Sequence, residues 1–229
     1  MDTTECIEME EYFNSLFDFK RGHFGDVKIY DVFTKKYIVK RITIYNNDKN
    51  NNDYVFNNEI NILQKIQDLT ISPRYISSLK CITYGYIIME RIDGITLKEY
   101  TTTINPILSD KELELIAMKI RLLHSYNISS NDLHTGNIMC TLDNNKKIVN
   151  IYIIDFGISN IITNLNEKKY KDDSDYTTFL YSITSSLDDT TYTPTDRLDE
   201  TPKWKERKRI DTIFNKIRSE KYIFRKNIN

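Results

Sequence analysis

Residues 131–139 read NDLHTGNIM, and residues 153–157 read IIDFG. Three oxygen-bearing side chains in these segments, Asp132, Asn137 and Asp155, fall in loops next to predicted strands. A carboxylate beside a hydroxyl nucleophile can orient it and accept its proton. An amide oxygen and a carboxylate are hard ligands suited to Mg²⁺ that carries phosphates. Either segment alone is consistent with Asx turns that close a hairpin, but the two in this order favour a phosphate-handling site.

The composition is that of an ordinary globular chain. The 229 residues are 40% hydrophobic and 28% charged, and the net charge of −1 indicates no general affinity for nucleic acid. No apolar run approaches the roughly 18 residues of a membrane-spanning helix. The three cysteines are scattered and odd in number, which argues against a disulfide framework or a zinc module, and Cys81 and Cys140 are expected to be buried apolar residues. We therefore expect an intracellular, cytoplasmic protein with no membrane association.

The order of predicted elements indicates an α+β fold. Alternation and turn residues predict strands at 26–33, 36–45, 80–84 and 86–91, and a hairpin at 137–141 and 147–154. Apolar spacing predicts helices at 53–66, at 109–123 and at 203–226, whereas residues 164–200 are predicted to be polar and partly loop. Strands come first and helices later, without strand–helix alternation, so we expect a β-rich lobe followed by a mainly helical one.

One strand carries a charged residue in an apolar row. One face of the strand 36–45 reads Ile38, Lys40, Ile42, Ile44, so the lysine would be buried and would need a partner. Glu59 lies on the inward face of the following helix and can supply that partner. The alternative is that Lys40 extends its ammonium to solvent.

Residues 19–27 read FKRGHFGDV and precede this strand. Two glycines that flank an aromatic residue suit a hairpin whose backbone N–H groups approach phosphates. Taken alone, the segment favours an ordinary hairpin turn over a phosphate-binding one.

Together these segments resemble, in order, the motifs of the protein-kinase catalytic core. Residues 37–40 resemble the strand that carries the phosphate-binding lysine, Glu59 follows Lys40 by the typical nineteen positions, and residues 87–91 resemble the strand that enters the hinge, with Met89 as gatekeeper. The resemblance implies ATP and Mg²⁺ as cofactors, with Asp132 as catalytic base and Lys40 and Glu59 as catalytic residues. It implies that Asn137 and Asp155 bind the metal. The residues that it places around the nucleotide are Phe19, Gly22, Gly25, Val27, Ile38, Lys40, Glu90, Ile92 and Met139.

The same resemblance implies a bilobal domain over residues 1–229. The β-rich N-lobe with one helix would cover about 1–91, the hinge about 90–94, and a reduced, mainly helical C-lobe about 95–229. Backbone groups of Glu90 and Ile92 would bind adenine in the hinge, and Met139 would form the floor of the adenine pocket.

Several positions depart from the family pattern. Lys20 stands in place of the first loop glycine, and Ser130 and Asn131 replace the His-Arg that precedes the catalytic aspartate. His134 stands where Ser/Thr kinases carry a lysine. A loop with histidine at this place is similar to that of haspin-like kinases and of aminoglycoside and choline phosphotransferases. No Ala-Pro-Glu follows residues 155–157, so the peptide-docking part is expected to be reduced. Asp173 or Asp175 would brace the catalytic loop.

The resemblance implies a serine/threonine-protein kinase that phosphorylates a protein hydroxyl. Two alternatives stay open: a small-molecule kinase of the aminoglycoside or choline type, and a nucleotide-binding pseudokinase scaffold. The basic tail 203–226 would contact an acidic protein or RNA, or would simply be a solvated helix face.

Overall fold

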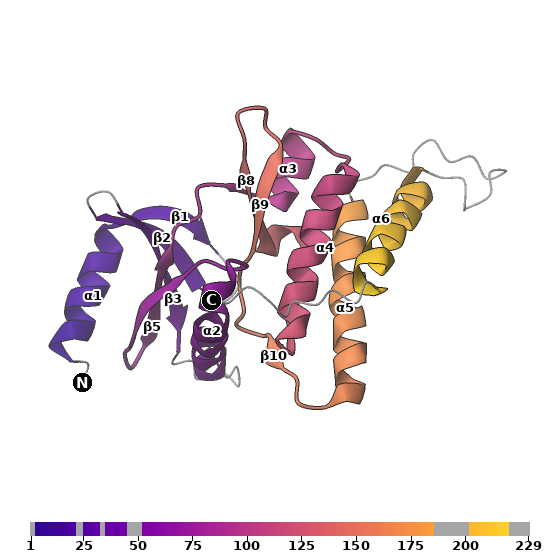
Figure 1. Cartoon of the computed structure of the whole chain (residues 1–229). Helices are drawn as coiled ribbons and strands as arrows, with labels where there is room; N and C mark the ends of the chain where they lie inside the picture. The colour runs from indigo at the N-terminus through magenta and orange to yellow at the C-terminus, as the bar shows by residue number, and fades with distance from the viewer. Residues whose placement is uncertain (1–2, 22–24, 33–34, 45–51, 186–201, 220–229) are drawn as a thin grey trace. The chain divides into compact units, whose positions relative to one another are not determined.

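The computed structural model describes residues 3–21, 25–32, 35–44, 52–185 and 202–219. The chain forms two compact units, which are described separately. The first comprises residues 1–93 and 152–161, and the second comprises residues 94–151 and 162–229 (Figure 1). The strand-rich first unit and the helical second unit confirm the predicted α+β class.

The first unit is built on a five-stranded antiparallel sheet with the order β1-β2-β3-β5-β4. Its strands are β1 (Phe17–Arg21), β2 (Gly25–Val32), β3 (Lys35–Thr43), β4 (Tyr75–Lys80) and β5 (Tyr84–Glu90). Residues 80–84 were predicted to be one strand, but Lys80 ends β4, Tyr84 begins β5, and residues 81–83 connect the two. The unit also contains the short strand β10 (Asn160–Ile161) and the 3-10 helix η1 (Gln67–Leu69).

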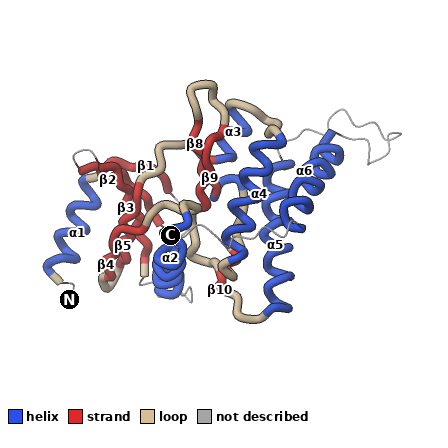
Figure 2. Tube along the Cα trace, viewed as in Figure 1, coloured by secondary structure: helices blue, strands red, loops and turns tan. Residues whose placement is uncertain are grey.

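Two helices cover opposite faces of this sheet, α1 (Thr4–Ser15) on one face and α2 (Asn52–Ile66) on the other (Figure 2). Adjacent residues of β3 point to opposite faces, and both Val39 and Lys40 are buried. Val39 packs with Phe13 of α1, whereas Lys40 reaches Glu59 of α2. Because helices cover both faces of the sheet, side chains on both faces of β3 are buried, and not only those of the apolar row that the sequence indicates.

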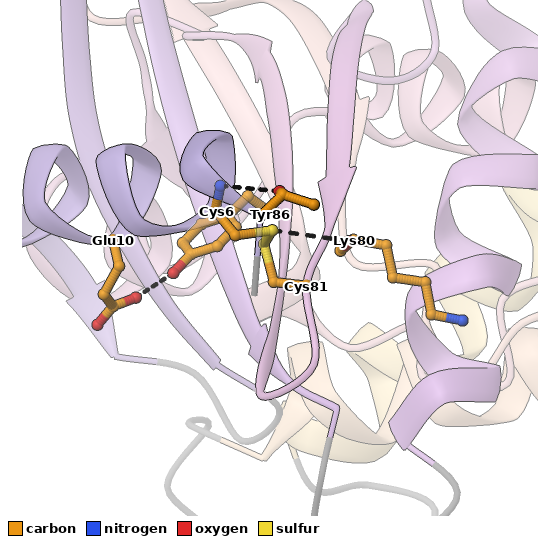
Figure 3. Close-up of a disulfide and its surroundings, with 6 residues drawn as sticks. Cys6, Glu10, Lys80, Cys81 and Tyr86 are labelled. Carbon is orange, nitrogen blue, oxygen red and sulfur yellow. Dashed lines mark hydrogen bonds between the residues drawn. A yellow bond between two sulfur atoms is a disulfide. The ribbon is translucent and has the colours of Figure 1, made fainter. Parts of the chain in front are cut away.

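Helix α1 was not expected from the sequence, and it carries a disulfide. Cys6 of α1 bonds to Cys81, 75 positions away, at the start of the turn before β5 (Figure 3). Glu10 accepts hydrogen bonds from Arg41 and from the Tyr86 hydroxyl, and the Arg41 guanidinium lies 4.5 Å from the centre of the Phe13 ring. The prediction that Cys81 is a free apolar residue is therefore wrong, because the partner cysteine lies on a helix that the sequence analysis missed.

The described part of the second unit consists mainly of four helices: α3 (Leu97–Thr103), α4 (Asp110–Ser125), α5 (Leu165–Thr184) and α6 (Pro202–Ser219). Ser109 and Glu112 form the predicted capping box at the start of α4. Phe214 of α6 packs against Tyr176 and Phe179 of α5, with ring centres 4.5 and 5.2 Å apart. Helix α5 lies in a stretch that the sequence predicts to be polar and partly loop. The helix was not recognised because most of its described side chains are exposed or half-buried, which leaves only a weak apolar pattern.

A short sheet completes this unit, with the order β6-β8-β9. Its strands are β6 (Ile95–Thr96), β8 (Ile138–Leu142) and β9 (Ile148–Ile153), and the unit also holds β7 (Ile128–Ser129) and the 3-10 helix η2 (Thr135–Asn137). Gly94 is needed where the chain enters β6, because a Cβ there would lie 2.2 Å from the carbonyl oxygen of Cys140. None of the helices in the described ranges has an apolar stretch long enough to cross a bilayer.

Candidate active site

A buried charge cluster occupies the first unit. The Lys40 ammonium donates to both carboxylate oxygens of Glu59, at 2.9 and 2.7 Å, and to Oδ1 of Asp155 at 2.9 Å. Lys40 is 6% exposed and Glu59 is 1% exposed, so the lysine does not extend to solvent. The ion pair expected between the strand and the helix is present, and Asp155 joins it as a third member.

Burial and charge act against each other in this cluster. Burial lowers the pKa of Lys40, but the neighbouring carboxylates of Glu59 and Asp155 outweigh that effect and raise the pKa above its ordinary value. Burial raises the pKa of Glu59, and Lys40 opposes this rise. A lysine whose pKa is raised by folding stabilises the folded state below its unfolded value of 10.5 and loses that contribution only as the pH rises through the folded value. The ammonium is therefore charged at neutral pH.

The segment after Asp155 is fixed by α2. The Asn58 side-chain amide donates to the carbonyl oxygens of Phe156 and Gly157, both at 3.1 Å, and to that of Ser159 at 2.7 Å. A Cβ on Gly157 would lie 2.5 Å from the side chain of Val55, so only glycine allows the segment to lie this close to α2. Sequence analysis missed Asn58, although its place one residue before Glu59 put it on the same helix.

Asp155 itself adopts a left-handed backbone conformation with φ 67°. Its Oδ1 accepts from Lys40, and none of the described residues donates a hydrogen bond to Oδ2. One carboxylate oxygen is thus held in place while the other can bind a cation.

The second unit contains the catalytic-loop candidates. The side-chain amide of Asn137 donates to the carbonyl oxygen and to Oδ2 of Asp132, both at 3.0 Å. Because the amide nitrogen is used in this way, the amide oxygen of Asn137 is the atom that can act as a metal ligand. Asn137 is buried, whereas the Asp132 side chain is 40% exposed and accessible to a substrate hydroxyl.

The backbone of this loop is held by Asp175 of α5. Its Oδ2 accepts from the Ser130 N–H at 2.8 Å and from the Ser129 hydroxyl at 3.0 Å, and its Oδ1 accepts from the Asn131 N–H at 2.7 Å. His124 lies 3.0 Å from the same carboxylate. Of the two aspartates considered from the sequence, Asp175 braces the loop, whereas Asp173 lies on the surface and pairs with Arg218.

The residues expected around a nucleotide are spread over both units. Ile38 and Val27 are half-buried on β3 and β2, and Ile92 and Met139 are buried, Met139 on β8. The Glu90 N–H donates to the Arg74 carbonyl at 2.9 Å, so Glu90 would contact adenine through its carbonyl oxygen. Gly25 begins β2 and Phe19 lies in β1, while Gly22 lies outside the described residues.

Comparison with known proteins identifies the family. The protein kinase domain family matches residues 20–195, so the chain belongs to the protein kinase family. It is 35% identical over 77 residues to the serine/threonine-protein kinase PknB of Mycolicibacterium smegmatis and 31% identical over 81 residues to the probable serine/threonine-protein kinase PknB of Lactococcus lactis. These alignments cover 32% and 34% of this chain and 12% of the length of each relative.

A solved structure supports the same fold. The crystal structure of a kinase domain superposes with a TM-score of 0.56 at 19% identity, and the match covers 73% of this chain and 62% of that one. At this identity the likeness concerns the fold alone.

Proposed function

We propose that this chain is an ATP- and Mg²⁺-dependent serine/threonine-protein kinase with Asp132 as its catalytic base. The observation that carries the proposal is the buried cluster of Lys40, Glu59 and Asp155, which holds an ammonium where few folds would tolerate one. Among the family motifs, the five residues with charge or metal-binding chemistry, Lys40, Glu59, Asp132, Asn137 and Asp155, are all chemically intact.

Each residue has a defined task in this proposal. Lys40 binds the α- and β-phosphates of ATP, and Glu59 holds Lys40 in position. By their motif positions, the Glu90 carbonyl and the Ile92 backbone are assigned to adenine, and Phe19, Gly22, Gly25, Val27, Ile38 and Met139 to the rest of the nucleotide. The free Asp155 Oδ2 and the Asn137 amide oxygen suit Mg²⁺, which neutralises phosphate charge when it is bound.

The chemical step is a single displacement. The substrate hydroxyl oxygen bonds to the γ-phosphorus as the bond from that phosphorus to the β,γ-bridging oxygen breaks, and ADP leaves. Asp132 accepts the hydroxyl proton. Little covalent chemistry falls to the protein, so positioning and charge neutralisation supply the rate.

The direct test is a radiolabel transfer assay with autophosphorylation and generic protein substrates. We expect Asp132→Ala and Asp155→Ala each to reduce transfer by at least about 10³-fold. Asp132→Ala should leave ATP affinity nearly unchanged, whereas Asp155→Ala should remove the Mg²⁺ dependence of ATP binding. Comparable transfer by the wild type and Asp155→Ala would refute the proposal.

One observation favours a second candidate, a small-molecule kinase. Only residues 158–164 separate Gly157 from the start of α5, which holds the loop-bracing Asp175. A peptide-docking segment has little room in so short a connection. A panel of alcohols and aminoglycosides assayed beside protein substrates separates the two candidates, because turnover of a small molecule with none on protein would reverse their order.

A contact surface for a protein or RNA partner is proposed on the first half of α6. Lys208 lies 4.9 Å from the Trp204 ring centre, and Arg207 lies 4.5 Å from that of Tyr181. Arg209 in the same half pairs with Glu206 and with Asp110, and Arg218 further along the helix pairs with Asp173. The rest of the predicted tail, residues 220–226, lies outside the described residues. Charge reversal of Lys205 and Lys208 should weaken salt-sensitive binding to an acidic peptide or to single-stranded RNA. Unchanged binding would favour the alternative that this part of α6 is only a solvated helix face.

An intracellular, cytoplasmic location belongs to the same proposal. Disulfides are rare in reducing compartments, so the Cys6–Cys81 bond provides a test. Mass spectrometry after lysis in a thiol-blocking reagent should find both cysteines blocked if the protein resides in a reducing compartment.

A further inference from the structure

His134 lies between two neighbours in the catalytic loop. Its Nδ1 accepts a hydrogen bond from the Gly136 N–H at 3.0 Å, and its Nε2 lies 3.6 Å from Oδ2 of Asp132. The ring thus caps the short helix η2 with one nitrogen and presents the other to the carboxylate. Both contacts lie within the second unit and connect residues at most two positions apart.

The hydrogen bond to Nδ1 determines where the imidazole proton resides. A backbone N–H can only donate, so Nδ1 must be the acceptor and carries no proton. In a neutral ring with this hydrogen bond the proton is on Nε2, the nitrogen that faces Asp132. Ser/Thr kinases carry a lysine at the corresponding place.

Gly136 is a glycine because of this ring. Among the described residues no glycine has a positive φ, so the backbone conformation does not require one here. A Cβ on Gly136 would lie 2.8 Å from Cε1 and 2.9 Å from Nδ1 of His134. Any side chain at 136 would therefore displace the ring from its place beside Asp132.

The two oxygens of Asp132 have different surroundings. Oδ2 accepts from the Asn137 amide at 3.0 Å and faces Nε2 of His134. None of the described residues donates a hydrogen bond to Oδ1. The Asn137 hydrogen bond holds Oδ2 in place, with the imidazole packed 3.6 Å away, so Oδ1 is the oxygen left open to a substrate hydroxyl.

We propose that His134 is a positioning residue, which together with Asn137 holds Oδ2 of Asp132 so that Oδ1 receives the proton of the substrate hydroxyl. This inference rests on the proposed function of Asp132. The His134–Gly136 pair is the structural unit behind it, because the glycine admits the ring and the ring orients the base.

Two substitutions separate the roles of the two ring nitrogens. In His134→Asn the amide oxygen can replace Nδ1 and keep the loop bond, but no group faces Asp132. In His134→Gln the amide nitrogen can reach the place of Nε2, while the bond to the Gly136 N–H is lost. We expect His134→Asn to lower kcat roughly 10- to 100-fold with KM for ATP unchanged within about twofold, and His134→Gln to recover most of kcat.

Opposite results would overturn the inference. If His134 only braces the loop, His134→Asn keeps the wild-type kcat and His134→Gln does not. Gly136→Ala tests the same role with the histidine retained, and it should lower kcat as far as His134→Asn does. A wild-type kcat in Gly136→Ala would contradict the role assigned to the ring.

Asp132→Ala, assayed in parallel, distinguishes failure of this inference from failure of the proposed function. Wild-type transfer by Asp132→Ala would end both, whereas an inactive Asp132→Ala beside a fully active His134→Asn would end only the role of His134. A readout independent of transfer is long-range ¹H–¹⁵N NMR of the imidazole. We expect the neutral ring to be the Nε2–H tautomer, and an Nδ1–H tautomer would refute the arrangement.

Discussion

In the first unit the site residues form a buried cluster of charges, whereas in the second unit the candidate catalytic loop is held largely through its backbone, with one side-chain bond from Asn137 to Asp132. Lys40, Glu59 and Asp155 form a buried cluster of side-chain charges. Asp132 stays exposed, and the loop around it is fixed because Asp175 accepts from the N–H groups of Ser130 and Asn131. The first arrangement does not tolerate the loss of a member, whereas the second holds one oxygen of Asp132 and leaves Oδ1 without a donor among the described residues.

The largest effect is expected from breaking the charge cluster. Lys40→Met leaves the Glu59 carboxylate buried without its main partner, and should lower the free energy of unfolding by about 3–5 kcal/mol in urea titrations. Lys40→Met combined with Glu59→Leu removes both charges and should return most of that stability without restoring transfer. A single variant within about 1 kcal/mol of the wild type would contradict this account.

The Cys6–Cys81 disulfide lies in the same unit and tests whether the stability of that unit depends on the charge cluster alone. Changing both Cys6 and Cys81 to Ser opens a loop of 75 positions and should cost about 4 kcal/mol, again measured by urea unfolding. ATP affinity should stay the same, because α1 covers the sheet face opposite Lys40. Reductant should lower the unfolding midpoint of the wild type and leave that of the double variant unchanged. Equal sensitivity of both would show that the bond does not contribute.

The backbone-held loop is tested at Asp175. Asp175→Asn turns an acceptor oxygen into an NH₂ group that faces other donors, and should cost about 2 kcal/mol of unfolding free energy together with a clear loss of kcat. Asp173→Asn is the matched control, since Asp173 is 46% exposed and pairs with Arg218 on the surface. That control should change stability by less than about 1 kcal/mol. A larger effect at Asp173 than at Asp175 would reverse the assignment.

The smallest effect concerns a structural cap away from the loop. Ser109→Ala removes the side-chain acceptor at the start of α4 and should cost about 1 kcal/mol, read as a lower melting temperature. Because the cap touches neither the cluster nor the loop, kcat should not change. A loss of kcat without a loss of stability would indicate that α4 transmits strain to the catalytic loop.

The charged residues of the site could be found from the sequence because each stands out locally. Lys40 interrupts an apolar row, Glu59 faces inward on an otherwise apolar helix face, and the two loop segments join carboxylates to turn residues. The bracing role of Asp175 could only be narrowed to two candidates, because the choice depends on which face of α5 meets the loop. Helix α1 and the Cys6–Cys81 bond were missed, since their pairing depends on contacts between distant parts of the chain.

The amino-acid sequence alone determined the fold class, the order of the motifs and the identity of the candidate site residues, since these depend on neighbours within a few positions. The tertiary structure decided which partner each of them has. It joined Asp155 to Lys40 across 115 positions, selected Asp175 over Asp173, and set the His134 ring against Gly136. Such pairings depend on how whole helices and strands pack, and on which side chains this packing removes from water. Neither can be read from residues that are close in sequence.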